Sequence, residues 1–148
     1  VPVTDTVVFQ PHLRKPGLTA LDIATGKTLW HTPAPKAECG SNGRCGNGLS
    51  AAISVMPGAV FAGSLDGMLR AYATTDGSIL WEFDTKQIYK TVNDIELSGG
   101  SINATGPSIA NGMLFINSGY GGVMNAGGMS TTKGQDGNVL LAFSIDGK

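Results

Sequence analysis

Apolar and polar residues alternate in short runs along this chain, and a turn sequence bounds each run. The run from Ala20 to Trp30 recurs fifty-one residues later, from Ala71 to Trp81, with alanine, glycine, leucine and tryptophan in register. A third copy of its apolar part covers Val139–Ile145. Shorter apolar runs precede the copies, at Thr6–Gln10, Ala59–Gly63 and Met113–Asn117. Alternation over such lengths between turn residues indicates half-buried β-strands.

A repeat of this length, built on short strands and tight turns, is typical of a four-stranded blade of a β-propeller. Such a blade takes about 40 to 50 residues, so the chain has room for about three. We therefore predict an all-β fold that forms part of a β-propeller. The predicted divisions are residues 1–35, a partial blade with its second to fourth strands; residues 36–86, a complete blade; and residues 87–148, a blade without its outer strand. Within the complete blade we expect strands at residues 50–56, 59–64, 68–74 and 78–84.

Closed propellers typically have 4 to 8 blades, so about three blades do not make a ring. We expect this chain to be a piece of a larger protein, with the remaining blades as its partners, because an open ring leaves unpaired strand edges. A strand from the other end of the polypeptide commonly completes the last blade. That arrangement predicts that Lys148 lies at or near the true C-terminus and that the N-terminus is an arbitrary cut. Self-assembly into a symmetrical closed ring is the alternative.

The connections between strands sort into two faces because consecutive strands run antiparallel. The loop-rich face, as we call it, carries the long segments 31–49, 85–101 and 119–137. Long loops gathered on one face of a rigid scaffold are where binding and catalysis usually occur. The alternative is that these segments are disordered insertions. The opposite face carries only tight turns, at Thr25-Gly26, Pro57-Gly58, Asp76-Gly77 and Asn111-Gly112.

Composition and cysteine usage narrow the function classes. The net charge of −1 and the lack of a basic stripe argue against binding to nucleic acid. No apolar run approaches the roughly 20 residues that span a bilayer. Cys39 and Cys45 lie in one glycine-rich loop, and we interpret them as a disulfide formed in an oxidising compartment. Two reduced thiols are the alternative. Metal binding is a still weaker interpretation of these cysteines, because no second cysteine or histidine pair has ligand spacing.

Trp30 and Trp81 could serve as stacking platforms for a ligand, but their position at the start of the outer strand argues otherwise. We expect each ring to pack on the next blade and each indole N–H to bond to backbone. Both residues are therefore assigned to docking between blades and excluded from the functional site.

The sequence from Ala20 to Trp30 resembles the tryptophan-docking motif of quinoproteins, the propeller dehydrogenases that use pyrroloquinoline quinone (PQQ). Non-enzymatic relatives such as BamB-type outer-membrane assembly lipoproteins share this motif. A more specific resemblance covers nearly the whole chain. Residues 63–72, 99–107, 117–121 and 137–143, in that order, are similar to the C-terminal part of polyvinyl-alcohol dehydrogenase-like quinoproteins.

This resemblance implies a periplasmic or secreted enzyme that oxidises secondary alcohols and passes electrons to a cytochrome c. It implies PQQ and Ca²⁺ as cofactors, with the quinone near the propeller axis under the loop-rich face. Tyr120 stands where the family usually has tryptophan. The residues that the resemblance places against the cofactor are Asn47, Ser101, Asn103, Gly119, Tyr120, Gly121 and Gly122.

No catalytic residue is assigned to this chain, since the carboxylate base and the cation beside the quinone come mostly from earlier blades in such enzymes. Lys90 and Asp94 fall on the loop-rich face, but solvated surface charges are the better interpretation. No Cys-x-x-Cys-His sequence is present, so haem c is not encoded in this chain. The competing hypothesis is a non-catalytic propeller that acts as a binding or assembly scaffold, for which we expect short loops on both faces.

Overall fold

The structure is a computed structural model, and it describes residues 6–12, 15–36, 46–103, 105–120 and 136–144. Within these residues every regular element is a β-strand, and the strands form three antiparallel sheets and one separate hairpin. None of the described residues belongs to a helix long and apolar enough to span a membrane. The all-β prediction is therefore confirmed.

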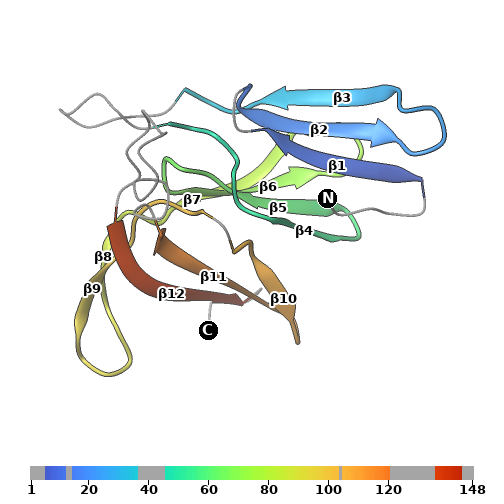
Figure 1. Cartoon of the computed structure of the whole chain (residues 1–148). Helices are drawn as coiled ribbons and strands as arrows, with labels where there is room; N and C mark the ends of the chain where they lie inside the picture. The colour runs from blue at the N-terminus through green and yellow to red at the C-terminus, as the bar shows by residue number, and fades with distance from the viewer. Residues whose placement is uncertain (1–5, 13–14, 37–45, 104, 121–135, 145–148) are drawn as a thin grey trace.

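The three sheets lie one below the other as successive blades (Figure 1). The first blade contains β1 (Val7–His12), β2 (Gly17–Asp22) and β3 (Thr28–Pro33). The second contains β4 (Ile53–Met56), β5 (Ala59–Gly63), β6 (Met68–Ala73) and β7 (Ile79–Asp84). The third contains β10 (Ser108–Ala110), β11 (Met113–Tyr120) and β12 (Asp136–Ser144). Neighbouring strands are consecutive in the sequence, which is the up-and-down order of a propeller blade.

Alternating side chains of each sheet point toward the neighbouring blade, and the core therefore lies between blades. Phe9, Leu18 and Ala20 of the first blade pack against Val60, Tyr72 and other apolar residues of the second. Leu69 of the second blade packs with Leu114 and Ile116 of the third. These residues are almost fully buried, and burial of an apolar side chain contributes about 1.5–3 kcal/mol.

Tryptophans lie at both contacts between blades. The Trp30 indole Nε1 donates a hydrogen bond of 3.1 Å to the Thr74 carbonyl in the β6–β7 turn. Gly77 in the same turn has a φ of 72°, and a Cβ atom there would come within 2.5 Å of the Trp30 ring. The Trp81 ring meets Phe143 of the third blade edge-on, with centroids 5.4 Å apart. Each ring thus contacts the next blade, while Trp81 stays 37% exposed.

The strands differ from the sequence expectation in three places. β4 begins at Ile53 rather than at residue 50, and the preceding Leu49 donates its N–H to the His12 carbonyl at the end of β1. β11 and β12 are longer than expected, so Gly119 and Tyr120 belong to a strand and not to a loop. The segment 85–101, expected to be a loop, contains the hairpin formed by β8 (Ile88–Lys90) and β9 (Glu96–Ser98).

Candidate functional site

Backbone hydrogen bonds at the loop-rich face link the three blades in one continuous series. The segments that enter the second and third blades, at Gly48–Leu49 and Ser101–Ile102, each bond to the preceding blade on one side and to their own blade on the other. We call this series the belt. Its four bonds are Leu49 N to His12 O (3.1 Å), Leu65 N to Gly48 O (3.0 Å), Ile102 N to Ser64 O (3.1 Å) and Gly119 N to Ser101 O (2.9 Å).

The belt is buried because its apolar side chains enter the contacts between blades. Leu49 and Ile102 belong to the two core clusters, and Leu65 is 3% exposed. Ser64 and Ser101 beside them are also buried, and the Ser101 hydroxyl donates to the Leu65 carbonyl over 2.5 Å. Apart from the half-buried His12, all residues that form the four belt bonds are buried, so the packing of the blades fixes the geometry of this face.

Three of the cofactor residues expected from the sequence lie together on the belt. Ser101 accepts the Gly119 N–H, and Asn103 follows two residues later. The Ser50 hydroxyl donates a 2.6 Å hydrogen bond to Asn103 Oδ1, which ties the second and third blades. Asn47 adjoins the belt at Gly48, but its side-chain amide donates to the Pro35 carbonyl over 2.6 Å and so is directed toward the end of β3.

The other predicted cofactor residues directly follow Gly119 in the chain. Tyr120 is the last residue of β11. Gly121 and Gly122 lie outside the described residues, and so do Cys39 and Cys45. The disulfide between the two cysteines therefore stays a prediction.

A buried pair of hydroxyls bonds to the backbone of Gly100, next to Ser101 of the belt, and the sequence did not predict it. Thr85 Oγ1 lies 2.7 Å from Ser118 Oγ, and both side chains are fully buried. The Ser118 hydroxyl accepts the Gly100 N–H, and the carbonyls of Gly67 and Gly100 lie 2.7 Å from Thr85 Oγ1 and 2.9 Å from Ser118 Oγ. Since each hydroxyl has one proton, one of the two donates to its partner and the other donates to a carbonyl. Ser118 lies near the end of β11 and Ser64 directly after the end of β5, and this correspondence between two blades was the available signal.

Three glycines bring the backbones of β11, β12 and the β9 end into direct contact. A Cβ atom on Gly119 would lie 2.0 Å from the Gly137 carbonyl carbon, and one on Gly137 would lie 2.4 Å from the Ser98 carbonyl oxygen. A Cβ atom on Gly99 would lie 1.6 Å from the Thr85 carbonyl oxygen. Larger residues do not fit at these crossings, so glycine fixes how β11 leaves the belt and how β12 returns to it.

A buried ionic group lies beside the belt, and its charges are satisfied internally. Arg70 and Asp66 are each 3% exposed. The Arg70 guanidinium donates to Ser64 Oγ over 3.2 Å and pairs with Asp66 at 3.6 Å and with Glu82 at 3.3 Å. Asp66 Oδ1 also accepts the Met68 N–H and the Ser64 hydroxyl. The group braces the β5–β6 turn, and its carboxylate is engaged by protein donors.

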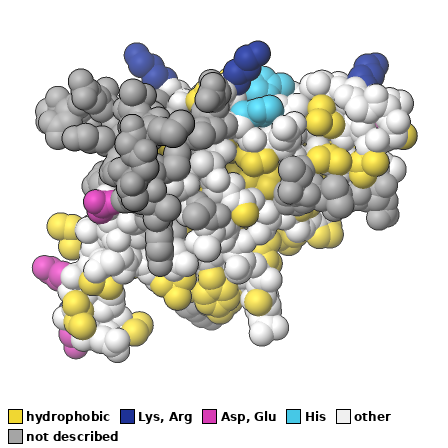
Figure 2. Space-filling model, viewed as in Figure 1, with side chains coloured by type: hydrophobic (Ala, Val, Ile, Leu, Met, Phe, Trp, Pro, Cys, Tyr) yellow, Lys and Arg dark blue, Asp and Glu magenta, His cyan; other side chains and the backbone are white. Residues whose placement is uncertain are grey.

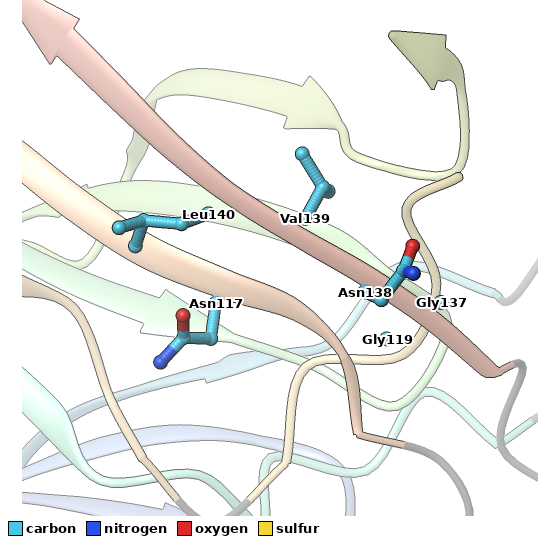
Figure 3. Close-up of a pocket in the computed structure, with 6 residues that line it drawn as sticks. All are labelled: Asn117, Gly119, Gly137, Asn138, Val139 and Leu140. Carbon is cyan, nitrogen blue, oxygen red and sulfur yellow. The ribbon is translucent and has the colours of Figure 1, made fainter. Parts of the chain in front are cut away.

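A half-open pocket of about 390 Å³ lies where β11 and β12 reach the loop-rich face (Figure 3). Two amide side chains stand at its wall beside an apolar valine and leucine, and glycines form the rest. Its lining residues are Asn117, Gly119, Gly137, Asn138, Val139 and Leu140. The pocket thus adjoins the belt at Gly119 and offers hydrogen-bonding groups without a titratable side chain.

The donor set of the site is neutral. Ser50, Ser101 and Asn103 carry hydroxyl and amide groups, and the Ser50 and Ser101 hydroxyls each donate their one proton within the protein, to Asn103 Oδ1 and to the Leu65 carbonyl. In the described part of the chain, no group of three or more histidine, cysteine, aspartate or glutamate side chains could hold a metal ion. The polar side chains that these residues bring to the belt are thus neutral hydroxyls and an amide.

Known proteins resemble this chain in sequence and in fold. A family model described as outer membrane protein assembly factor BamB matches residues 14–145. A polyvinylalcohol dehydrogenase from Pseudomonas sp. is 48% identical over 138 residues, covering 90% of this chain and 21% of that protein. A 1-butanol dehydrogenase (cytochrome c) from Thauera butanivorans is 40% identical over 67 residues, covering 45% of this chain and 10% of that protein.

Among solved structures, the quinohemoprotein alcohol dehydrogenase ADHIIG from Pseudomonas putida HK5 is 26% identical to this chain, with a TM-score of 0.58. The match covers 79% of this chain and 16% of that one. The chain therefore spans about a fifth or less of the length of these three alcohol dehydrogenases.

Proposed function

We propose a function for this chain from one premise, namely that it belongs to the family of PQQ-type β-propellers whose model is described as outer membrane protein assembly factor BamB. Within this family we assign the chain to the dehydrogenases. It forms about three blades of a quinone-dependent alcohol dehydrogenase, and the remaining blades complete the ring. The observation that carries this assignment is the 48% identity with a polyvinylalcohol dehydrogenase over 90% of the chain.

The loop-rich face is the proposed cofactor face. We assign Asn103 and the Gly119 backbone to contact with PQQ. The Ser50 and Ser101 hydroxyls, which donate to Asn103 Oδ1 and to the Leu65 carbonyl, hold the backbone of this face in position. When bound, PQQ accepts the two electrons that an alcohol carbon loses as it becomes a carbonyl carbon. We assign neither the base that removes the hydroxyl proton nor the ligands of Ca²⁺ to this chain.

The proposed substrate is a secondary alcohol, as in a polymer of vinyl alcohol, and the proposed electron acceptor is a cytochrome c. The named substrate and acceptor of the two relatives support these choices. We place the protein in the periplasm or outside the cell, where a Cys39–Cys45 disulfide would persist.

PQQ binding and dye reduction test the proposal. The full-length protein that contains this chain is titrated with PQQ in the presence of Ca²⁺, and alcohol-dependent reduction of a dye is followed. We expect binding with turnover, and about tenfold weaker PQQ binding in Asn103→Ala, because one buried hydrogen-bonding group is lost. Asn93→Ala, which alters an exposed asparagine, is the matched control.

A non-catalytic scaffold is the second candidate, and the description of the family model favours it. A folded full-length protein that binds no PQQ and reduces no dye with any alcohol would establish this alternative and exclude the dehydrogenase.

A further inference from the structure

The third blade leaves open the face that the first two blades bury. On each blade a phenylalanine of β1, β5 or β11 pairs with an alanine of the next strand, and a leucine lies two residues before that alanine. The pairs are Phe9–Ala20, Phe61–Ala71 and Phe115–Ala142, and the leucines are Leu18, Leu69 and Leu140. Leu18 and Leu69 are 0% exposed, because the following blade packs on them, whereas Leu140 is 63% exposed.

This uncovered surface has a defined occupant in the repeat itself. We call the face of the third blade that carries Phe115, Asn117, Leu140 and Ala142 the open face. Hydrophobic side chains gather on the lower side of the molecule in Figure 2, where the third blade lies. One repeat unit cannot bury its apolar face alone, and the neighbour stacked on it completes the core. A further blade is therefore the partner that fits the open face.

The belt shows how such a blade attaches. The N–H groups of Leu49 and Ile102, which enter the second and third blades, donate to the carbonyls of His12 and Ser64. Each acceptor lies opposite the residue that precedes the repeated leucine, and Ser118 occupies the same place on the third blade. The Ser118 carbonyl is thus the equivalent acceptor for the next segment of the belt.

One residue distinguishes the open face from the two covered ones. The residue paired with the repeated leucine is Pro11 on the first blade, Gly63 on the second and Asn117 on the third. At Gly63 the side chain of Ile102 fills the space, since an added Cβ atom would lie 2.2 Å from Ile102 Cγ2. Asn117 instead carries an amide at this place, on the strand next to Leu140 (Figure 3).

The amide limits what the covering blade places against it. An isoleucine seated as Ile102 is at Gly63 would collide with the Asn117 side chain and leave its amide without a partner. Burial of an unpaired amide is costly, so buried amides are hydrogen-bonded. The pocket of about 390 Å³ that Asn117 and Asn138 line has room for a polar side chain, and both amides can donate and accept.

We propose that the open face receives a further blade whose entering segment donates an N–H to the Ser118 carbonyl and places an uncharged hydrogen-bonding side chain, rather than leucine or isoleucine, against Asn117. The inference rests on one part of the proposed function, namely that the remaining blades complete the ring. Asn117 thereby selects the blade that closes on the third one, because the apolar segments that fit the other two contacts leave its amide unpaired.

Thiol labelling of the full-length protein that contains this chain tests whether the open face is covered. Ala142→Cys places a thiol on this face, and Leu80→Cys places one on β7, where Leu80 is 59% exposed although its blade has a neighbour on each side. Mass spectrometry of peptides labelled with N-ethylmaleimide separates these thiols from Cys39 and Cys45. We expect the Ala142→Cys thiol to react at least about 100-fold more slowly in folded than in unfolded protein, and the Leu80→Cys thiol to slow less than about tenfold.

Asn117→Leu in the Ala142→Cys background tests the polar contact. We expect about tenfold faster labelling, because the contact loses a hydrogen-bonded pair and opens more often. Asn117→Ser keeps a hydrogen-bonding group and should accelerate labelling less than Asn117→Leu does. Asn93→Leu, at an exposed asparagine of the β8–β9 turn, is the matched control and leaves the rate unchanged.

Two results would overturn the inference. Equal slowing of the Ala142→Cys and Leu80→Cys thiols would show that no blade covers the open face. Labelling that Asn117→Leu leaves unchanged or slows would show an apolar contact like the other two. Neither PQQ nor an alcohol enters the measurement, so it decides this inference even if the protein binds no PQQ and reduces no dye.

Discussion

Substitution of Gly77 measures how strongly a docking tryptophan couples two blades. Gly77→Ala places a methyl group where the Trp30 ring and the Thr32 hydroxyl lie 2.4–2.8 Å away. The residue also has a φ of 72°, a conformation that costs alanine about 1 kcal/mol. Overpacking against the ring adds about 1–3 kcal/mol. We therefore expect the free energy of unfolding to fall by about 2–4 kcal/mol.

Gly112→Ala is the matched control, because Gly112 has a φ of 74° and no atom within 4 Å of its added Cβ. Both variants carry the same backbone cost, and their difference isolates the contact between blades. Urea denaturation followed by far-UV circular dichroism gives both values. A Trp30→Phe background removes part of the ring and should reduce the cost of Gly77→Ala. Equal destabilisation by the two glycine substitutions would refute this account of docking.

Three further predictions follow from the same structure. Thr85→Val and Ser118→Ala should each lower the free energy of unfolding by about 1–3 kcal/mol, because buried partners lose hydrogen bonds. A double-mutant cycle should show a coupling of at least about 0.5 kcal/mol between the two substitutions, and strictly additive effects would contradict a joint role. Hydrogen bonds from the Ser78 backbone and side chain lower the pKa of Asp76, so its contribution to stability is present above the unfolded pKa of about 3.9 and is lost as pH falls through the lower folded pKa. The urea midpoints of the parent and of Asp76→Asn, measured between about pH 2.5 and 6, should therefore converge at the acid end. Parallel curves would count against this role of Asp76. Thiol titration of the unfolded, unreduced protein should find no free thiol if Cys39 and Cys45 are bonded, whereas two reactive thiols would exclude the disulfide.

The repeat in the sequence was sufficient to predict the blades. Alternation and tight turns located the strands of the second blade within three residues, because turn chemistry and the period of two are local properties. The hairpin at Ile88–Ser98 was missed, since three-residue strands separated by a five-residue turn give too short an alternating pattern. The added length of β11 and β12 was missed as well, because glycines in a strand look like a loop in the sequence.

The family resemblance identified Ser101, Asn103 and Gly119 as candidate cofactor residues, and only the structure showed how they lie relative to one another. Ser101 and Gly119 are bonded through backbone atoms, and any residue type carries those atoms. The supporting hydroxyls of Thr85 and Ser118 are 33 residues apart, with no local pattern that pairs them.

The sequence by itself determined the fold class, the blade repeat and the face on which the long segments gather, because each depends on the order of apolar, polar and turn residues along the chain. The tertiary structure decided which buried polar groups are paired, how the belt joins the three blades and which apolar residues remain in water. These features depend on contacts between residues that are distant in the chain, and such contacts exist only once the blades pack against one another.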